Sequence, residues 1–135
     1  MGLGTTPLRR AAAVLAVAGT AAIAGCGGDD QPSPTEAASA AADDFAAAIG
    51  SGDYEAACGA LTDQLATQLG GEACSEQIGE IAGEGDVEIE VTNVRVSGPK
   101  AVAETEVRRS GESAQESSFD LVESGDDWKV SGFGD

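Results

Sequence analysis

The sequence predicts an α+β fold in which N-terminal helices pack on a curved, four-stranded antiparallel sheet. Three observations predict it. Apolar residues recur at helical spacing as far as about residue 82, and they alternate at strand spacing from residue 86 onward. Short turns containing Gly or Asp separate the alternating segments. Strands joined in sequence by short turns form an antiparallel meander, and one face of that sheet is apolar. The preceding helices are expected to cover this apolar face.

Residues 1–25 have the layout of a secretory signal. Two arginines precede a thirteen-residue apolar run that ends at Ile23, and small residues follow it. A helix that spans a membrane needs about twenty apolar residues, so a permanent transmembrane anchor is the weaker interpretation. The layout predicts that the chain is exported.

The end of this leader, Ile23-Ala24-Gly25-Cys26, resembles a bacterial lipobox, in which an aliphatic residue and two small residues precede a cysteine. The resemblance implies that the Cys26 thiol is acylated, with palmitate among the acyl chains, and that the mature chain begins at Cys26. Two or more acyl chains anchor stably, because each buried CH₂ contributes about 0.8 kcal/mol. We therefore expect attachment to the extracytoplasmic face of the cell membrane. A plain secretory signal with an unmodified cysteine is the alternative.

The other two cysteines are expected to pair. If lipid occupies Cys26, Cys58 and Cys74 remain in an oxidising compartment with no thiol left over. Helical spacing aligns Cys74 with Ile78 and Ile81 on a face toward the core, where Cys58 could meet it. A disulfide would stabilise the fold by roughly 3 kcal/mol. A reduced, buried pair is the alternative.

Residues 26–33 form a predicted tether rich in Gly, Asp and Pro. The first helix begins after Ser33, because Ser33-Pro34-Thr35-Glu36 is a capping box with proline at the first helical position. Ala38, Ala41, Phe45 and Ile49 form its apolar stripe. Gly50-Ser51-Gly52 is expected to end the helix.

Two short helices should follow, capped by Asp53 and Thr62. Gly70-Gly71 breaks the helical run, and a further helix is expected over residues 72–82. From residue 87 the residues alternate, but Val87, Ile89 and Val91 share one parity whereas Val94 and Val96 share the other. Because a one-residue shift exchanges the two sheet faces, the spacing predicts a β-bulge at Thr92-Asn93.

Three short turns, at residues 97–100, 110–112 and 124–126, separate the remaining strands. In the second strand Ala101, Ala103, Thr105 and Val107 should face the core, which leaves Glu104, Glu106 and Arg108 on the solvated face. Phe119 with Leu121 marks the third strand, and Trp128 with Val130 marks the fourth.

With these elements in order, residues 34–135 resemble a domain of the NTF2-like superfamily, which includes SnoaL-like and ketosteroid-isomerase-like domains, and especially the NTF2-like lipoproteins of actinobacteria. The matching features are the long opening helix, the segment from Gly52 to Cys58, the second cysteine, the bent strands and the closing Trp128-Lys129-Val130. The resemblance implies a curved sheet that wraps on the helices and forms a cone, and the sequence does not determine whether that cone is open at one end. Four residues are candidate pocket-lining residues: Phe45, Tyr54, Phe119 and Trp128.

Composition limits the function classes. After Cys26 the chain has five cationic residues and 24 carboxylates, a net charge of −19 that disfavours binding to nucleic acid. It has no histidine, which excludes imidazole chemistry. Neither the carboxylates near residue 85 nor those at 126–127 have the spacing of a calcium loop. We therefore expect no metal, no cofactor and no catalytic residues.

The expected function is that of a non-enzymatic binding or accessory domain in the cell envelope. Its partners would be the membrane, through the lipid on Cys26, and either an envelope protein or a small apolar ligand. One alternative is an isomerase or lyase with a buried carboxylate of raised pKa in the cone. Another is a purely structural envelope lipoprotein. The sequence leaves the oligomeric state open.

Overall fold

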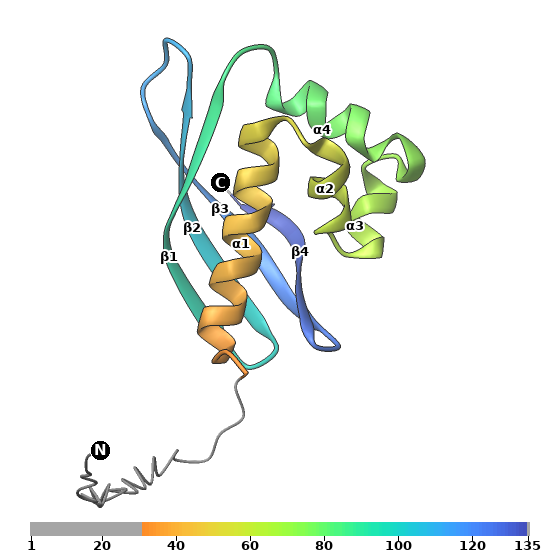
Figure 1. Cartoon of the computed structure of the whole chain (residues 1–135), viewed down its shortest axis with the longest axis vertical. Helices are drawn as coiled ribbons and strands as arrows, with labels where there is room; N and C mark the ends of the chain where they lie inside the picture. Colours follow the sequence, from red (N-terminus) through yellow and green to blue (C-terminus); the bar gives the residue numbers. More distant parts are fainter. Residues whose placement is uncertain (1–30, 135) are drawn as a thin grey trace, which may run out of the picture. The chain divides into compact units, whose positions relative to one another are not determined.

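The structure is a computed structural model that describes residues 31–134. The predicted leader, the lipobox and Cys26 lie outside the described residues. Helical segments come first and four strands follow, with the helices gathered on one side of the sheet (Figure 1). The predicted α+β arrangement is confirmed. No helix within residues 31–134 is long and apolar enough to cross a membrane.

Helix α1 (Pro34–Ser51) begins and ends where the sequence predicts. The Ser33 hydroxyl accepts a hydrogen bond from the Glu36 N–H at 3.2 Å, and the Glu36 carboxylate accepts one from the Ser33 N–H at 2.9 Å. Hydrogen bonding of the Glu36 carboxylate, first to the Ser33 backbone N–H and then to the Ser33 side chain, holds the pKa of Glu36 below its usual value. The helix ends at Gly52, whose φ of 76° lies in the left-handed region that glycine adopts without a Cβ clash.

Three shorter helices follow: α2 (Tyr54–Gly59), α3 (Asp63–Gln68) and α4 (Cys74–Ala82). The side chains of Asp53 and Thr62 cap α2 and α3, as predicted. The helix expected over residues 72–82 is instead divided into a 3-10 turn, η1 (Gly71–Ala73), and α4. Gly70 and Gly71 have φ of 96° and 59°, so the backbone cannot enter a continuous α-helix there.

A disulfide between Cys58 and Cys74 joins α2 to the first residue of α4, with 6.1 Å between the Cα atoms. Cys74 is buried and Cys58 is half-buried. The predicted pairing is therefore what the structure shows. It fixes the start of α4, which has no side-chain cap of its own.

The sheet contains β1 (Val87–Ser97), β2 (Lys100–Arg109), β3 (Gln115–Ser124) and β4 (Asp127–Gly134). Each strand is antiparallel to the next, in the order β1-β2-β3-β4. The predicted bulge is present, because the pairing with β2 passes from Val91 directly to Asn93, so Thr92 has no partner residue in β2. Val91 and Val94 are consequently both half-buried despite their opposite parity.

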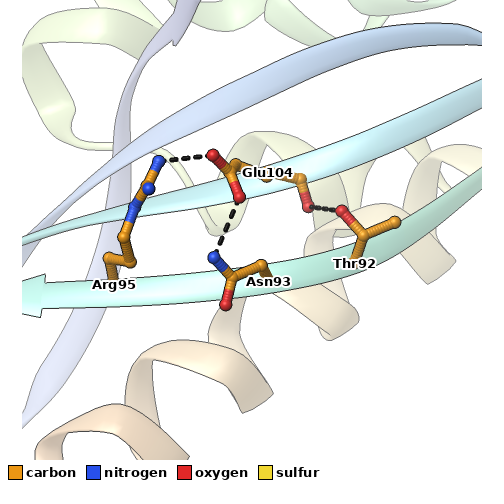
Figure 2. A network of polar contacts seen from close by, with 4 residues as sticks. All are labelled: Thr92, Asn93, Arg95 and Glu104. Atoms are coloured by element: carbon orange, nitrogen blue, oxygen red, sulfur yellow. Dashed lines mark hydrogen bonds and ion pairs between the residues drawn. The ribbon is translucent and has the colours of Figure 1, made fainter.

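The solvated face of β2 carries a polar network beside this bulge (Figure 2). The Glu104 carboxylate accepts a hydrogen bond from Asn93 Nδ2 at 2.9 Å and pairs with Arg95. The Glu104 carbonyl oxygen accepts one from the Thr92 hydroxyl at 3.1 Å. Since Ala103 and Thr105, on either side of Glu104, are buried, the predicted division of β2 into two faces is confirmed.

A second bulge lies in β4 and was not predicted. Asp120 pairs with Gly132 but Leu121 pairs with Val130, so Ser131 is the extra residue. The bulge changes the parity of the strand, and Phe133 therefore lies on the same face as Val130. Phe133 is paired with Phe119 across the strands, and the two ring centroids are 6.0 Å apart.

The core lies between α1 and the sheet and extends under α2 to α4. Phe45, Leu121 and Val130 are its largest fully buried side chains. One core prediction was wrong: Ile81 is 61% exposed, whereas Ala82 is 5% exposed. The buried side of α4 turns toward Ala82 at the end of the helix, which leaves Ile81 at the edge of the core.

Candidate functional site

The main candidate site is an apolar cavity of about 240 Å³ between the helices and the sheet. It is larger than the 150 Å³ engineered cavities that bind benzene, and smaller than the roughly 300–1,000 Å³ of sites for drug-sized ligands. By that scale it accommodates about ten non-hydrogen atoms. Eleven of its thirteen lining residues are apolar: Phe45, Ile49, Leu69, Ile78, Ile81, Ala82, Val87, Ile89, Val107, Phe119 and Phe133.

The lining residues include ones from the last turns of α1, the end of α4 and the start of β1. Figure 1 shows that these three element ends lie at the same end of the fold. Phe45 and Ile49 come from the last turns of α1, and Val87 is the first residue of β1. Ile81 and Phe133 line the cavity although they are 61% and 47% exposed. These two partly exposed side chains therefore mark its mouth.

Aromatic side chains form the inner wall. The rings of Phe45 and Phe119 meet edge to face with centroids 4.9 Å apart, and Phe133 stacks on Phe45 at 5.9 Å. Such arrangements are the preferred ones for aromatic pairs, and each contributes about 0.5–1.5 kcal/mol beyond the buried area. The aromatic wall therefore runs from the buried Phe45 and Phe119 to Phe133 at the mouth.

The structure brings together two of the four candidate lining residues. Phe45 and Phe119 both line the cavity. Tyr54 instead packs on α4, where its ring lies 3.1 Å from the position that a Cβ atom would take at Gly79. Trp128 is buried beside the start of α1, in a separate surface hollow that Pro32 and Asp126 also line.

Two polar residues complete the cavity lining, Arg109 and Ser117. Arg109 is the last residue of β2, and its guanidinium donates from Nη1 to the Ala82 carbonyl at 2.7 Å and from Nη2 to the Ile81 carbonyl at 3.3 Å. The Ser117 hydroxyl donates to the Gly134 carbonyl at 3.1 Å. Both side chains are therefore hydrogen-bonded to backbone carbonyls of other elements, although Arg109 is exposed.

None of the carboxylates among residues 31–134 lines this cavity. In the part of the chain that the structure describes, every Asp and Glu is exposed except Glu104 and Glu106, which are half-buried on the solvated face of β2. The same residues contain no cluster of three or more side chains able to hold a metal ion. None of the described lining residues is therefore the buried carboxylate that the isomerase alternative requires.

Of the thirteen lining residues, sequence reasoning named Phe45 and Phe119 as pocket candidates and missed the other eleven, among them both polar residues, Arg109 and Ser117. A signal for Arg109 was available, because it continues the inward parity of Ala103, Thr105 and Val107 on β2. The inward direction of Phe133 depends on the bulge at Ser131, for which Gly132 inside the same strand was an available signal.

Comparison with solved structures shows that the fold is NTF2-like. The chain is similar to a candidate NTF2-like transpeptidase from Campylobacter jejuni, with a TM-score of 0.53 and 18% identity over 70% of this chain and 96% of that one. It is also similar to an NTF2-like protein of unknown function from Shewanella oneidensis, with a TM-score of 0.47 and 13% identity over 75% and 97% of the two chains. No protein-family model and no curated protein matches the sequence.

Proposed function

We propose that this chain is an exported, lipid-anchored binding protein, whose NTF2-like domain takes a small, mainly apolar molecule into the cavity between α4 and the sheet. The apolar cavity is the observation that carries the proposal. In the described part of the chain the lining consists of eleven apolar residues and two hydrogen-bonded polar residues, with no carboxylate among them, and such a space suits binding better than proton transfer.

The size of the cavity sets the expected affinity. A ligand of about ten non-hydrogen atoms at roughly 0.5 kcal/mol per atom gains about 5 kcal/mol, which corresponds to a Kd of about 0.2 mM. The three phenylalanine rings favour a flat or unbranched body that packs against them. A ligand with this Kd would occupy the cavity if its concentration outside the cytoplasm were in the same sub-millimolar range.

The position of the cavity suits a domain that is tethered at its N-terminus. Residue 34 opens α1, whereas the α1 residues that line the cavity, Phe45 and Ile49, lie about 17 and 23 Å further along that helix. In the proposed lipoprotein, residues 26–33 would connect the lipid to the end of the domain that lacks the cavity. The ligand would therefore enter from the extracytoplasmic space.

The anchor is tested by mass spectrometry of the full-length chain, extracted with detergent from bacterial membranes. We expect a mass that lacks residues 1–25, carries acyl groups on Cys26 and lacks two hydrogens for the Cys58–Cys74 disulfide. The matched variant Cys26→Ser should remain unacylated. An unacylated wild-type chain that is secreted into the medium would favour the plain signal peptide and refute the anchor.

The cavity is tested with 1-octanol as the probe and isothermal titration calorimetry as the measurement. Val107→Trp places a larger side chain in the cavity, whereas Val102→Trp places it on the opposite, exposed face of the same strand. We expect wild type and Val102→Trp to bind, and Val107→Trp to bind at least tenfold more weakly. Equal affinities in the two variants would place octanol elsewhere and refute the proposed site.

No observation favours an enzyme as a second candidate. The likeness to the candidate transpeptidase rests on 18% identity, which supports the fold alone. Cys58 and Cys74 are joined in a disulfide, so neither offers a free thiolate. A protein partner or a purely structural role would be left if octanol and related probes failed to bind.

A further inference from the structure

The charged residue in the cavity lining has the opposite sign to most charged residues of the chain. Although the chain after Cys26 carries 24 carboxylates and five cationic residues, the residues of 31–134 that line the cavity include one cation and no anion. That cation is Arg109, placed beside the mouth residue Ile81 whose carbonyl it contacts. A site that merely followed the average composition of the surface would be lined by acidic groups.

The charge of Arg109 has no anionic partner among residues 31–134. Two other arginines of the sheet do form ion pairs, Arg95 with Glu104 and Arg108 with Glu106. Arg109 donates only to the carbonyl oxygens of Ile81 and Ala82 at the end of α4. Those acceptors are neutral, so they hold the guanidinium in place without cancelling its charge.

The geometry leaves Arg109 able to receive a ligand. A guanidinium has five N–H donors in a planar, preorganised fork, and the two bonds to α4 leave others available. Carboxylates fit that fork well. The Ser117 hydroxyl, on the neighbouring strand, adds a second polar group to an otherwise apolar wall.

We propose that the cavity selects a small monocarboxylic acid, whose apolar body packs on Phe45 and Phe119 and whose carboxylate pairs with Arg109 at the mouth. This inference rests on the proposed function and adds the chemical class of the ligand. The acidic surface opposes anions at long range, but at physiological salt charges more than about 8 Å apart are largely screened. The contact with Arg109 therefore dominates once the ligand is in the cavity.

The test compares three probes with the same eight-carbon chain: octanoate, 1-octanol and octylammonium, at pH 7 and 0.15 M salt. On the wild-type protein we expect octanoate to bind roughly three- to tenfold more tightly than octanol, as for a partly exposed charge-assisted bond. Octylammonium should bind more weakly than octanol. Octanol binding as tightly as octanoate, or octylammonium binding most tightly, would overturn the inference.

Arg109→Gln should reduce the octanoate-to-octanol affinity ratio to about one, whereas Arg109→Lys should keep part of it. Arg108→Gln is the matched control, because Arg108 lies on the other face of the same strand and should leave the ratio unchanged. Octanol binding serves as the measure of an intact cavity in each variant. A ratio that persists in Arg109→Gln would refute the role of Arg109.

The outcomes separate the two proposals. If octanol binds and octanoate shows no advantage, the cavity proposal stands and the carboxylic acid inference fails. If none of the three probes binds the wild-type protein, both fail.

Discussion

Removal of the Cys58–Cys74 disulfide should cost the domain about 3 kcal/mol of folding free energy. The two cysteines are 16 residues apart. In the chain-entropy treatment, closing a loop of that length removes about 10 cal/mol/K from the unfolded chain, or about 3 kcal/mol at 25 °C. For a domain of about one hundred residues this should lower the Tm by roughly 12–20 °C. The loss should also loosen α4, which supplies one wall of the cavity.

The assay is urea denaturation of three samples followed by circular dichroism: oxidised wild type, wild type in a reducing agent, and the double variant Cys58→Ala/Cys74→Ala. Alanine is preferred to serine because Cys74 is 2% exposed and a buried hydroxyl would lack a partner. Reduced wild type keeps both sulfur atoms, so its difference from the oxidised protein isolates the cross-link. A difference below about 1 kcal/mol between those two samples would refute the loop-entropy reasoning.

Two further predictions concern polar groups. Thr105 is 2% exposed and its hydroxyl has no hydrogen-bond partner. In urea denaturation, Thr105→Val should therefore leave stability unchanged or raise it by up to about 1 kcal/mol. The control Thr62→Val removes a helix cap and should lower stability by about 1 kcal/mol, and a clear loss of stability in Thr105→Val would show that the Thr105 hydroxyl is satisfied. The folded-state pKa of Glu36 is depressed by its bonds to Ser33, so its stabilising contribution is fully present above the unfolded pKa of about 4.3 and is lost as the pH falls through the lower, folded value. The stability difference between wild type and Glu36→Gln should therefore shrink between pH 5 and pH 3, and a difference that is constant with pH would contradict the capping role.

Local signals in the sequence predicted most of the fold. The capping box at Ser33, the caps at Asp53 and Thr62, and the change of parity after Val91 each depend on a few neighbouring residues, and all four features are present. The pairing of Cys58 with Cys74 followed from counting cysteines, and the structure contains it.

The candidate site was harder to predict because it depends on contacts between distant elements. Phe45 and Phe119 lie at the cavity, but Tyr54 and Trp128 have other neighbours although they are equally aromatic. Aromatic character indicates burial and does not indicate which part of the core a ring occupies. Phe133 lines the cavity because of the bulge at Ser131, which we did not predict from the sequence.

Occupation of the cavity is tested most directly by the isoleucine side chains. All four isoleucines of residues 31–134 line it: Ile49, Ile78, Ile81 and Ile89. In a protein labelled on isoleucine and valine methyl groups, saturating 1-octanol should give intermolecular NOEs to all four isoleucine methyls and none to the exposed Val102. NOEs to Val102 alone, or none at all with octanol in excess, would contradict the account.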